Sequence, residues 1–213
     1  MKRRGYMTIV GAVLAAGLPL VVWAQQTPPK DAGAKPEATP GAQAKTETYK
    51  IDPVHSSVVF RIKHLDISYI YGRFNEVGGT VVLNEADPAA CATEAEVKVE
   101  SIDTHNADRD KHLKSPDFFD AEKHPLITFK STSFKKAGEQ TYEVQGNLTL
   151  HGVTKPLTVK LERTGAGPGM KSEFRAGFET EFTVKRSEFD MKTMVGPVGD
   201  DVRLTVSLET VRQ

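Results

Sequence analysis

The side chains of this 213-residue chain that are best suited to chemistry lie in one charged segment. His105, Asp108, Asp110 and His112 fall within eight residues of one another. Imidazole and carboxylate groups at this spacing can ligate a metal ion or act as an acid–base pair. A metal site usually needs a further protein ligand and outer hydrogen-bonding partners, and the sequence places neither. The spacing also suits solvated charges on a short helix, so we predict no metal and no catalytic residue.

Two basic side chains stand at the ends of apolar segments. His64 follows Phe60 and Ile62, and Arg186 follows Phe182. At the mouth of a pocket, either could contact a polar head group. Alternatively, each is a charge at the end of a strand that hydrogen-bonds to loop backbone.

Two motifs that can signal catalysis or phosphate binding are incomplete. His55-Ser56 lacks the G-x-S-x-G elbow of a hydrolase. The segment 196–201 resembles a phosphate-binding loop, but no lysine follows it and it leads into a strand-like segment. We therefore interpret it as a turn and predict no cofactor.

Composition excludes several classes of protein. Lys and Arg number 28, as do Asp and Glu, so the chain lacks the basic footprint of a nucleic-acid-binding protein. Cys91 is the single cysteine, which excludes an internal disulfide framework and a cysteine-based zinc site. In an exported protein this thiol would have no intrachain partner. We expect it to be free, with an intermolecular bridge as the alternative.

The first 24 residues have the pattern of a secretory signal peptide. Basic residues near the start precede an uncharged, mostly apolar run, and Val22 and Ala24 are the small residues expected before a cleavage site. An uncleaved membrane anchor is the alternative, although Pro19 interrupts the run. Cleavage after Ala24 would remove Trp23, the only tryptophan.

The segment after the signal peptide is predicted to be a linker. Residues 25–47 consist mainly of Pro, Ala, Gly, Gln, Thr and Lys, which cannot bury enough apolar surface to offset the entropy of ordering. The folded domain is therefore expected at 48–213. No apolar stretch within it is long enough to cross a bilayer, so we expect no stable membrane span after cleavage.

From Ser56 onward, apolar residues recur mostly at every second position, which is the period of a β-strand. Strands that alternate in this way, with one wet face, are typical of antiparallel sheet. About eight of them can close into a barrel or split into a sandwich, and the lack of a strand interrupted by proline favours closure. The segments are 58–63, 74–84, 94–100, 126–134, 142–149, 157–162, 174–182 and 202–209.

Short helices are predicted in one or two of the connections. The segment 106–114 is charged, lacks Gly and Pro, and precedes Ser115-Pro116, which indicates a short helix or a pair of turns. A second helical turn is predicted at 66–71. The predicted fold is thus all-β, with one or two short helices between strands.

A series of short motifs runs through the predicted domain: Tyr49-Lys50-Ile51-Asp52, His55-Ser56-Ser57-Val58-Val59-Phe60, His64, Gly72-Arg73-Phe74, Ser101-Ile102-Asp103-Thr104, Arg109-Asp110-Lys111-His112-Leu113-Lys114-Ser115, Asp117-Phe118-Phe119-Asp120, Pro125-x-Ile127-x-Phe129-x-Ser131, Gly146-x-Leu148-x-Leu150-His151-Gly152-Val153-Thr154-Lys155-Pro156 and Arg186-x-x-Phe189. Together they resemble the YceI-like family. The resemblance covers about Tyr49 to Val211, and the ordered series is specific although each motif alone is weak. One departure is Asp190, where the family often has glycine, which leaves the local loop shape open.

The resemblance implies an eight-stranded antiparallel barrel, similar in form to lipocalins, with an apolar tunnel for a long isoprenoid or related lipid. It also implies export to the periplasm, where the protein would carry or store this lipid without catalysis. Members are often dimeric, which makes a homodimer possible. His64 and Arg186 would then be candidate head-group contacts. The residues expected to line the tunnel are Phe60, Ile62, Phe129, Leu148, Phe178, Phe182 and Leu204.

Two other functions stay open at this point. A lipid-modifying enzyme would use His64, His112 or Asp110 for acid–base chemistry at the mouth of the pocket. A structural or stress-response module would have a solidly packed barrel, because an eight-stranded interior either fills with side chains or keeps room for one small ligand.

Overall fold

The computed structural model describes residues 45–213. The predicted signal peptide at 1–24 lies outside this range, as do positions 25–44 of the predicted linker. The last residue assigned to the linker, Glu47, already begins the first strand and pairs with Leu83.

Strands make up most of the described chain, and every pair of neighbouring strands is antiparallel. They form a single sheet. Its segments are β1 (Glu47–Ile51), β2 (Ser57–His64), β3 (Ser68–Phe74), β4 (Val77–Leu83), β5 (Ala92–Lys98), β6 (Ile102–Asp103), β7 (Leu126–Lys136), β8 (Thr141–Leu150), β9 (Val153–Pro168), β10 (Phe174–Lys185) and β11 (Val198–Arg212).

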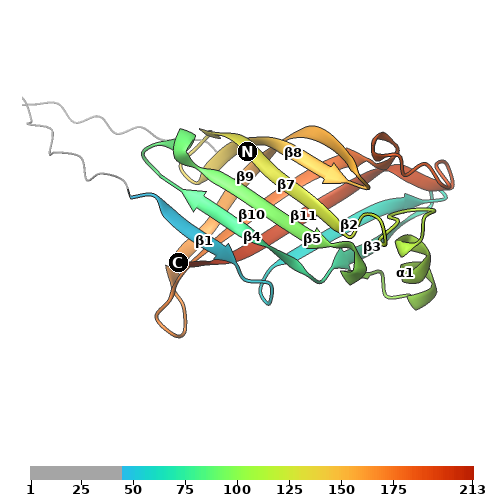
Figure 1. Ribbon diagram of the computed structural model, residues 1–213, viewed down its shortest axis with the longest axis horizontal. Coiled ribbons are helices and arrows are strands. Elements are labelled where there is room, and N and C mark those ends of the chain that lie inside the picture. The colour runs from blue at the N-terminus through green and yellow to red at the C-terminus, as the bar shows by residue number, and fades with distance from the viewer. Residues whose placement is uncertain (1–44) are drawn as a thin grey trace, which may run out of the picture. The chain divides into compact units, whose positions relative to one another are not determined.

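These segments build an eight-stranded barrel because three of its strands are each broken into two pieces. The three broken strands consist of β1 with β2, β3 with β4, and β5 with β6. β1 pairs with β4 and β2 with β3, and on the other side β4 pairs with β5 and β3 with β6. From β7 to β11 each strand pairs with the next, and β11 closes the ring by pairing with both β1 and β2 (Figure 1). The predicted all-β antiparallel barrel is confirmed. Each strand of the barrel has one face toward the interior and one toward solvent, which is why apolar and polar residues alternate on nearly every strand.

Between β6 and β7 the chain leaves the barrel and forms α1 (Ala107–Lys114). Asn106 caps this helix, because its side chain accepts a hydrogen bond of 3.0 Å from the backbone N–H of Arg109. Acidic residues occupy its first turn and basic residues its last, as the helix dipole favours. The short helix predicted at 106–114 is therefore confirmed. The 3₁₀ helices are η1 (Pro88–Ala90), η2 (Val99–Ser101) and η3 (Arg186–Phe189).

No helix within residues 45–213 combines the length and the apolar character needed to cross a membrane.

The helical turn predicted at 66–71 is wrong. Leu65 and Asp66 adopt positive φ angles and form a tight turn, after which β3 pairs with β2. The aromatic and β-branched residues of β3 suit the pleated surface of a strand better than a helix. Charged and polar neighbours around the turn obscured this preference in the sequence.

One end of the barrel is packed solid. Tyr49, Phe134, Tyr142 and Phe178 are almost completely buried there, and the Phe134 and Tyr142 rings meet edge to face at 6.3 Å. Burial raises the pKa of Tyr49 to about 12. The two ends of the described chain also meet at this end, where the backbone N–H of Gln213 donates to the Thr48 carbonyl (Figure 1).

Cys91 belongs to the same packed core and is 8% exposed. Its sulfur accepts a hydrogen bond from the Asn84 backbone N–H, and burial raises the pKa of the thiol. We expect a thiol reagent to modify Cys91 slowly in the native protein and completely after unfolding in guanidinium. Modification of the native protein at the rate of a free cysteine, or a disulfide dimer on a non-reducing gel, would contradict this.

Asp190 occupies the position where the family that the sequence resembles often has glycine. Its backbone conformation explains why either residue fits there. It ends η3 with a φ of 61°, in the left-handed region. Glycine reaches this region without strain, and aspartate is among the few other residues that tolerate it. The loop shape that the sequence left open is therefore the one that glycine would also adopt.

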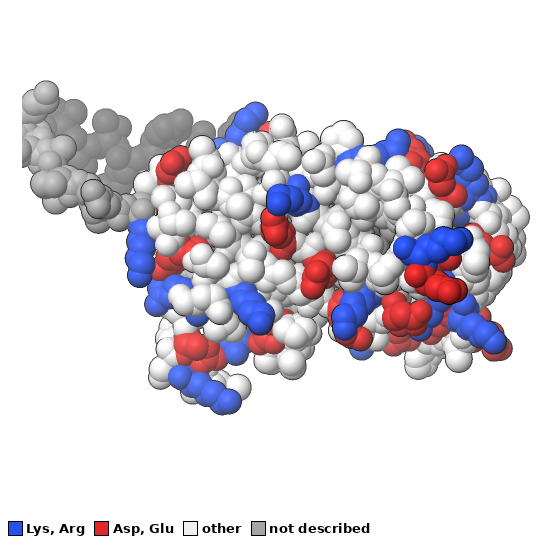
Figure 2. Space-filling view, viewed as in Figure 1, with Lys and Arg blue, Asp and Glu red and all other residues white. Residues whose placement is uncertain are grey.

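Charges of both signs are interspersed over the visible face of the barrel (Figure 2). This agrees with the equal numbers of acidic and basic residues in the chain. The face shown therefore provides no single-sign field of the kind that attracts a nucleic acid.

Candidate functional site

The end of the barrel opposite the packed core is hollow. It encloses a cavity of about 430 Å³, which lies in the range of small-molecule binding sites. The wall is formed by inward-facing residues of β2–β5 and β7–β11, together with α1 and the segment that follows it. Most of these residues are aliphatic or aromatic, so the site suits a hydrocarbon ligand.

Six of the seven residues predicted to line a tunnel lie in this wall, and strand pairing places them together. Phe60 pairs with Leu204, which also pairs with Phe182, so these three form one row across β2, β11 and β10. Phe129 pairs with Leu148 in the opposite part of the ring. The six residues in the wall are Phe60, Ile62, Phe129, Leu148, Phe182 and Leu204.

Phe178, the seventh predicted residue, lies outside the cavity wall. It has the same inward phase as Phe182 but lies four residues, or two repeats of the strand alternation, deeper along β10, opposite Leu208. There it is 1% exposed and belongs to the packed core. The phase of a strand therefore identifies inward residues, but it does not tell the hollow part of the barrel from the filled part.

Two strand glycines make room for aromatic rings of the wall. A Cβ atom at Gly72 would overlap the Phe60 ring, and one at Gly146 would overlap the Phe129 ring. The tip of each ring thus occupies the space that a side chain at the glycine would need. Because the rings occupy these recesses, they take up less of the lumen than rings that point into it.

Two threonine side chains of the cavity wall carry a buried hydroxyl group. Among the described residues, no hydrogen-bonding group contacts the buried oxygens of Thr93 and Thr180. Both can hydrogen-bond to a polar atom within the cavity, such as water or an oxygen of a bound molecule.

The mouth of the cavity is covered in part by α1 and the residues after it, which lie beyond the ends of the strands (Figure 1). Leu113, Phe118 and Phe119 line the cavity from this cover. The Phe119 ring meets the Phe74 ring edge to face at 5.7 Å, which anchors the cover to β3.

Arg109 brings a positive charge to the mouth, which the sequence did not single out. Its Nε donates to Thr104 Oγ1 and its Nη2 to the Thr104 carbonyl, at 2.8 and 2.6 Å. Asp110 accepts from both the backbone N–H and the hydroxyl of Thr104. This network holds α1 in place and occupies Asp110, while Arg109 and Thr104 line the cavity. The motif Arg109-Asp110 after the capping residue was the available signal.

His112 also lines the cavity, and its Nε2 lies 2.8 Å from Asp117 Oδ2. A carboxylate in this position orients an imidazole, as it does for a general base. Within residues 45–213, however, no hydroxyl or thiol side chain hydrogen-bonds to the His112 ring, so no nucleophile is in place beside it.

His64 and Arg186 both contribute to the cavity wall, but the nitrogen atoms of Arg186 are already used in hydrogen bonds to the protein backbone. Arg186 is 3% exposed, and its guanidinium donates to the carbonyls of Met191, Thr193, Val198 and Gly199. Burial lowers the pKa of Arg186. Its donors therefore hold the connection between β10 and β11, which is the loop-backbone role that the sequence left as the alternative.

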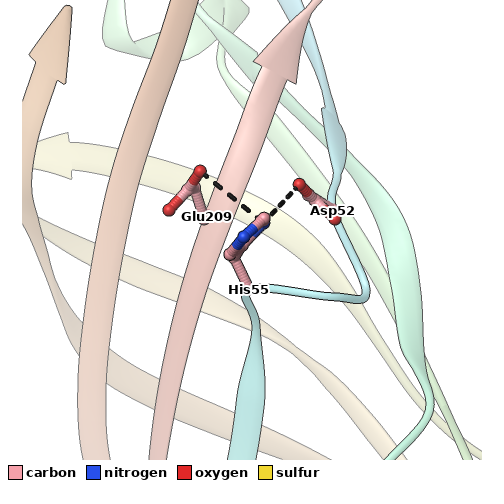
Figure 3. A group of neighbouring side chains, drawn as sticks. All are labelled: Asp52, His55 and Glu209. Carbon is pink, nitrogen blue, oxygen red and sulfur yellow. Dashed lines mark hydrogen bonds and ion pairs between the residues drawn. The ribbon is translucent and has the colours of Figure 1, made fainter. Parts of the chain in front are cut away.

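One cluster has the composition of a metal site but is already neutralised. Asp52, His55 and Glu209 bring their ligand atoms within 4.8 Å of one another at the break between β1 and β2 (Figure 3). His55 Nδ1 lies 2.8 Å from Asp52 Oδ2. Arg175 donates to both Asp52 and Glu209 and so supplies the positive charge that a cation would bring.

This cluster predicts a pH-dependent stability. Hydrogen bonds from His55 and Arg175 lower the pKa of Asp52 from 3.8 to about 2. Because the folded state favours the carboxylate, the stabilisation is complete above about pH 5 and is lost as the pH falls through about 2. Asp52→Asn should lower the free energy of unfolding at pH 7 by about 1–2 kcal/mol and flatten its pH dependence between pH 5 and 2.

Urea unfolding measured across this pH range tests the Asp52 prediction. The control is Glu139→Gln, at an exposed residue that forms no ion pair in the described part of the chain. A pH profile of Asp52→Asn that parallels the profile of the unsubstituted protein would show that the cluster is not the origin.

Comparison with known proteins finds a matching domain family and similar structures. Residues 49–210 match the model of the YceI-like domain. The protein YceI of Escherichia coli O157:H7 is 44% identical over 167 residues, covering 78% of this chain and 87% of that protein. The crystal structure of Burkholderia cenocepacia BcnA has a TM-score of 0.68 at 25% identity, covering 75% of this chain and 98% of that one.

A polyisoprenoid binding domain from Saccharophagus degradans, implicated in plant cell wall breakdown, has a TM-score of 0.60. It is 13% identical, and the match covers 78% of this chain and 98% of that domain. At this identity the likeness extends to the fold alone.

Proposed function

This chain belongs to the YceI-like family, and we propose that it binds one long-chain isoprenoid or related lipid in the barrel cavity, as a carrier or store. The observation that carries the proposal is the hollow end of the barrel, with about 430 Å³ enclosed by a largely hydrocarbon wall. A solidly packed structural module has no use for such a space. The polyisoprenoid binding domain with the same fold supports the choice of ligand.

The energetics suit a long chain better than a short one. Each methylene group removed from water contributes about 0.8 kcal/mol, so ten buried carbons contribute roughly 8 kcal/mol. Association and ordering of the chain cost an amount of similar size. Tight binding therefore requires considerably more than ten buried carbons, which a polyprenyl chain supplies.

The polar head of the lipid is proposed to lie at the mouth, near His64, Arg109 and His112. All three side chains line the cavity, and Arg109 keeps one guanidinium nitrogen, Nη1, free of the two hydrogen bonds to Thr104. Arg186 is less suited to this role because the loop carbonyls already occupy its donors. Thr93 and Thr180 provide further polar contacts within the wall.

The proposed role is binding without catalysis. The alternative enzyme would rely on His64, His112 or Asp110 for acid–base chemistry. Asp110 already accepts two hydrogen bonds from Thr104, whereas His64 and His112 line the cavity and are the residues to test. Turnover of extracted lipid that is abolished by His112→Ala, with lipid binding retained, would replace the carrier with the enzyme.

Lipid carried by the native protein tests the proposal directly. We expect native mass spectrometry of gently purified protein to show a lipid adduct, which extraction with organic solvent removes and identifies. The matched variants are Leu204→Asn, which places an amide in the wall, and Thr205→Asn, its outward neighbour on β11. The first should lose the adduct and the second should keep it. A mass without adduct, together with no uptake of a polyprenyl probe, would refute the proposal.

The protein is proposed to act in the periplasm after cleavage behind Ala24. The supporting observation is the three-part pattern of residues 1–24. Because Trp23 would leave with the signal peptide, the mature protein should show no tryptophan emission. Tryptophan emission from purified periplasmic protein, or an intact mass that includes residues 1–24, would contradict cleavage.

A further inference from the structure

Exposed apolar side chains gather at the mouth of the cavity. Of the nine large apolar residues that are exposed in residues 45–213, six lie on the β2–β3 turn, on β3 or on the β10–β11 connection. We call these six residues the mouth patch: Leu65, Ile67, Tyr69, Tyr71, Met194 and Val195. Apolar surface that clusters in this way marks an interaction site more often than scattered residues do.

The fold joins the two segments of the mouth patch, which are far apart in sequence. The backbone N–H of Leu65 donates to the Pro197 carbonyl at 2.7 Å, and His64 pairs with Val198. Leu65 and Met194 both hold positive φ angles, which bulky residues rarely adopt. Backbone of this kind is kept where the surrounding structure requires it, often at functional sites.

The mouth patch is continuous with the cavity. Met194 lines the cavity and is also 49% exposed, so it belongs to both surfaces. Ile70 lines the cavity from β3, between the outward-facing Tyr69 and Tyr71. An apolar chain that leaves the cavity here passes directly onto the patch.

Cations accompany the tyrosines on the outer face of the hairpin. The Arg61 guanidinium lies 4.3 Å from the centre of the Tyr69 ring, and Lys63 Nζ lies 5.0 Å from it. Neither cation forms an ion pair with another side chain of the part of the protein that the structure covers. Negative charge is also present, because Asp66 lies at the tip of the turn and Glu181 is near enough to Arg61 to interact with it electrostatically. Tyrosine, lysine and arginine at one level are typical of side chains that meet the head groups of a bilayer.

We propose that the mouth patch docks on the surface of a phospholipid bilayer containing anionic lipid, so that the cavity opens toward the membrane. This inference rests on the proposed function. A lipid chain that crosses water exposes its methylene groups at about 0.8 kcal/mol each, whereas a docked mouth keeps them covered. Leu65 and Ile67 enter the interface, and Arg61 and Lys63 contact lipid phosphates.

Flotation of the purified full protein with vesicles tests the docking. The vesicles contain equal parts of phosphatidylethanolamine and phosphatidylglycerol. Ile67→Ser, at a residue 82% exposed, should reduce the partition coefficient about tenfold. The matched control is Val54→Ser, which is 81% exposed in the β1–β2 turn and should bind as the unsubstituted protein does. Asp66→Asn should strengthen binding, and added salt should weaken it.

The outcomes separate the docking from the proposed function. Loss of flotation in Ile67→Ser alone, with uptake of a polyprenyl probe unchanged in solution, supports the docking. Equal flotation of both serine variants, or no flotation of the unsubstituted protein despite probe uptake, overturns it. Absence of probe uptake in the unsubstituted protein instead refutes the lipid-binding function. If Ile67→Ser leaves vesicle binding unchanged but converts a dimer into a monomer, the patch is a self-association surface and the proposal is wrong.

Discussion

Replacing Gly72 by alanine is expected to lower the affinity for a polyprenyl ligand about tenfold or more. The new methyl group would overlap the Phe60 ring and approach Thr104 Cγ2 to 2.8 Å. The three atoms nearest to such a Cβ belong to side chains, so the Phe60 ring can move aside, and the space open to it is the cavity that it lines. Overpacking of this kind also costs about 1–3 kcal/mol of stability. A fluorescent polyprenyl probe titrated into both proteins measures the loss.

The Gly72 prediction has a control and a rescue. Gly165→Ala adds the same methyl group to β9, where no atom lies within 4 Å, and should leave affinity unchanged. Adding Phe60→Leu to Gly72→Ala removes the displaced ring and should restore most of the binding. If Gly72→Ala binds the probe normally, the ring does not move into the lumen and the recess does not control the width of the cavity.

Replacing Arg186 by methionine is expected to cause the largest loss of stability. The carbonyls of Met191, Thr193, Val198 and Gly199 would lose their common donor in a buried loop. Unsatisfied buried acceptors are costly, so we expect the free energy of unfolding to fall by about 3 kcal/mol or more. For a domain of this size, that lowers Tm by about 6–12 °C.

Thermal unfolding of Arg186→Met measures this effect, and the neighbouring Lys185→Gln is the control. Lys185 forms an exposed ion pair with Asp201, and exposed ion pairs contribute little, so its Tm should not change measurably. A stable Arg186→Met protein that has lost only lipid affinity would restore the role of Arg186 as a head-group contact.

The barrel could be predicted from the sequence because the period of two is a local property. On β2, Phe60 and Ile62 face the lumen while Arg61 and Lys63 face solvent, and the sequence shows this alternation directly. The breaks that divide three strands in two depend on pairing between distant segments. The sequence therefore did not predict β1, β3 or β6 as separate strands.

The candidate site could be predicted only in part. Inward phase identified six residues of the wall, but Phe178 has the same phase and lies in the packed core. Arg109 and His112 reach the mouth only because α1 folds back over the strand ends. No periodicity in the sequence records that placement, since it depends on contacts such as the Phe74–Phe119 pair.

The sequence alone thus determined the strand period, the antiparallel class, the short helix at 106–114 and the family resemblance, because these follow from local patterning. Only the tertiary structure decided where the barrel is filled and where it is hollow, that Arg186 is bound by loop carbonyls, and that the β2–β3 turn meets the β10–β11 connection. Empty space and the sharing of hydrogen bonds depend on which distant side chains meet, and that is settled when the ring of strands closes.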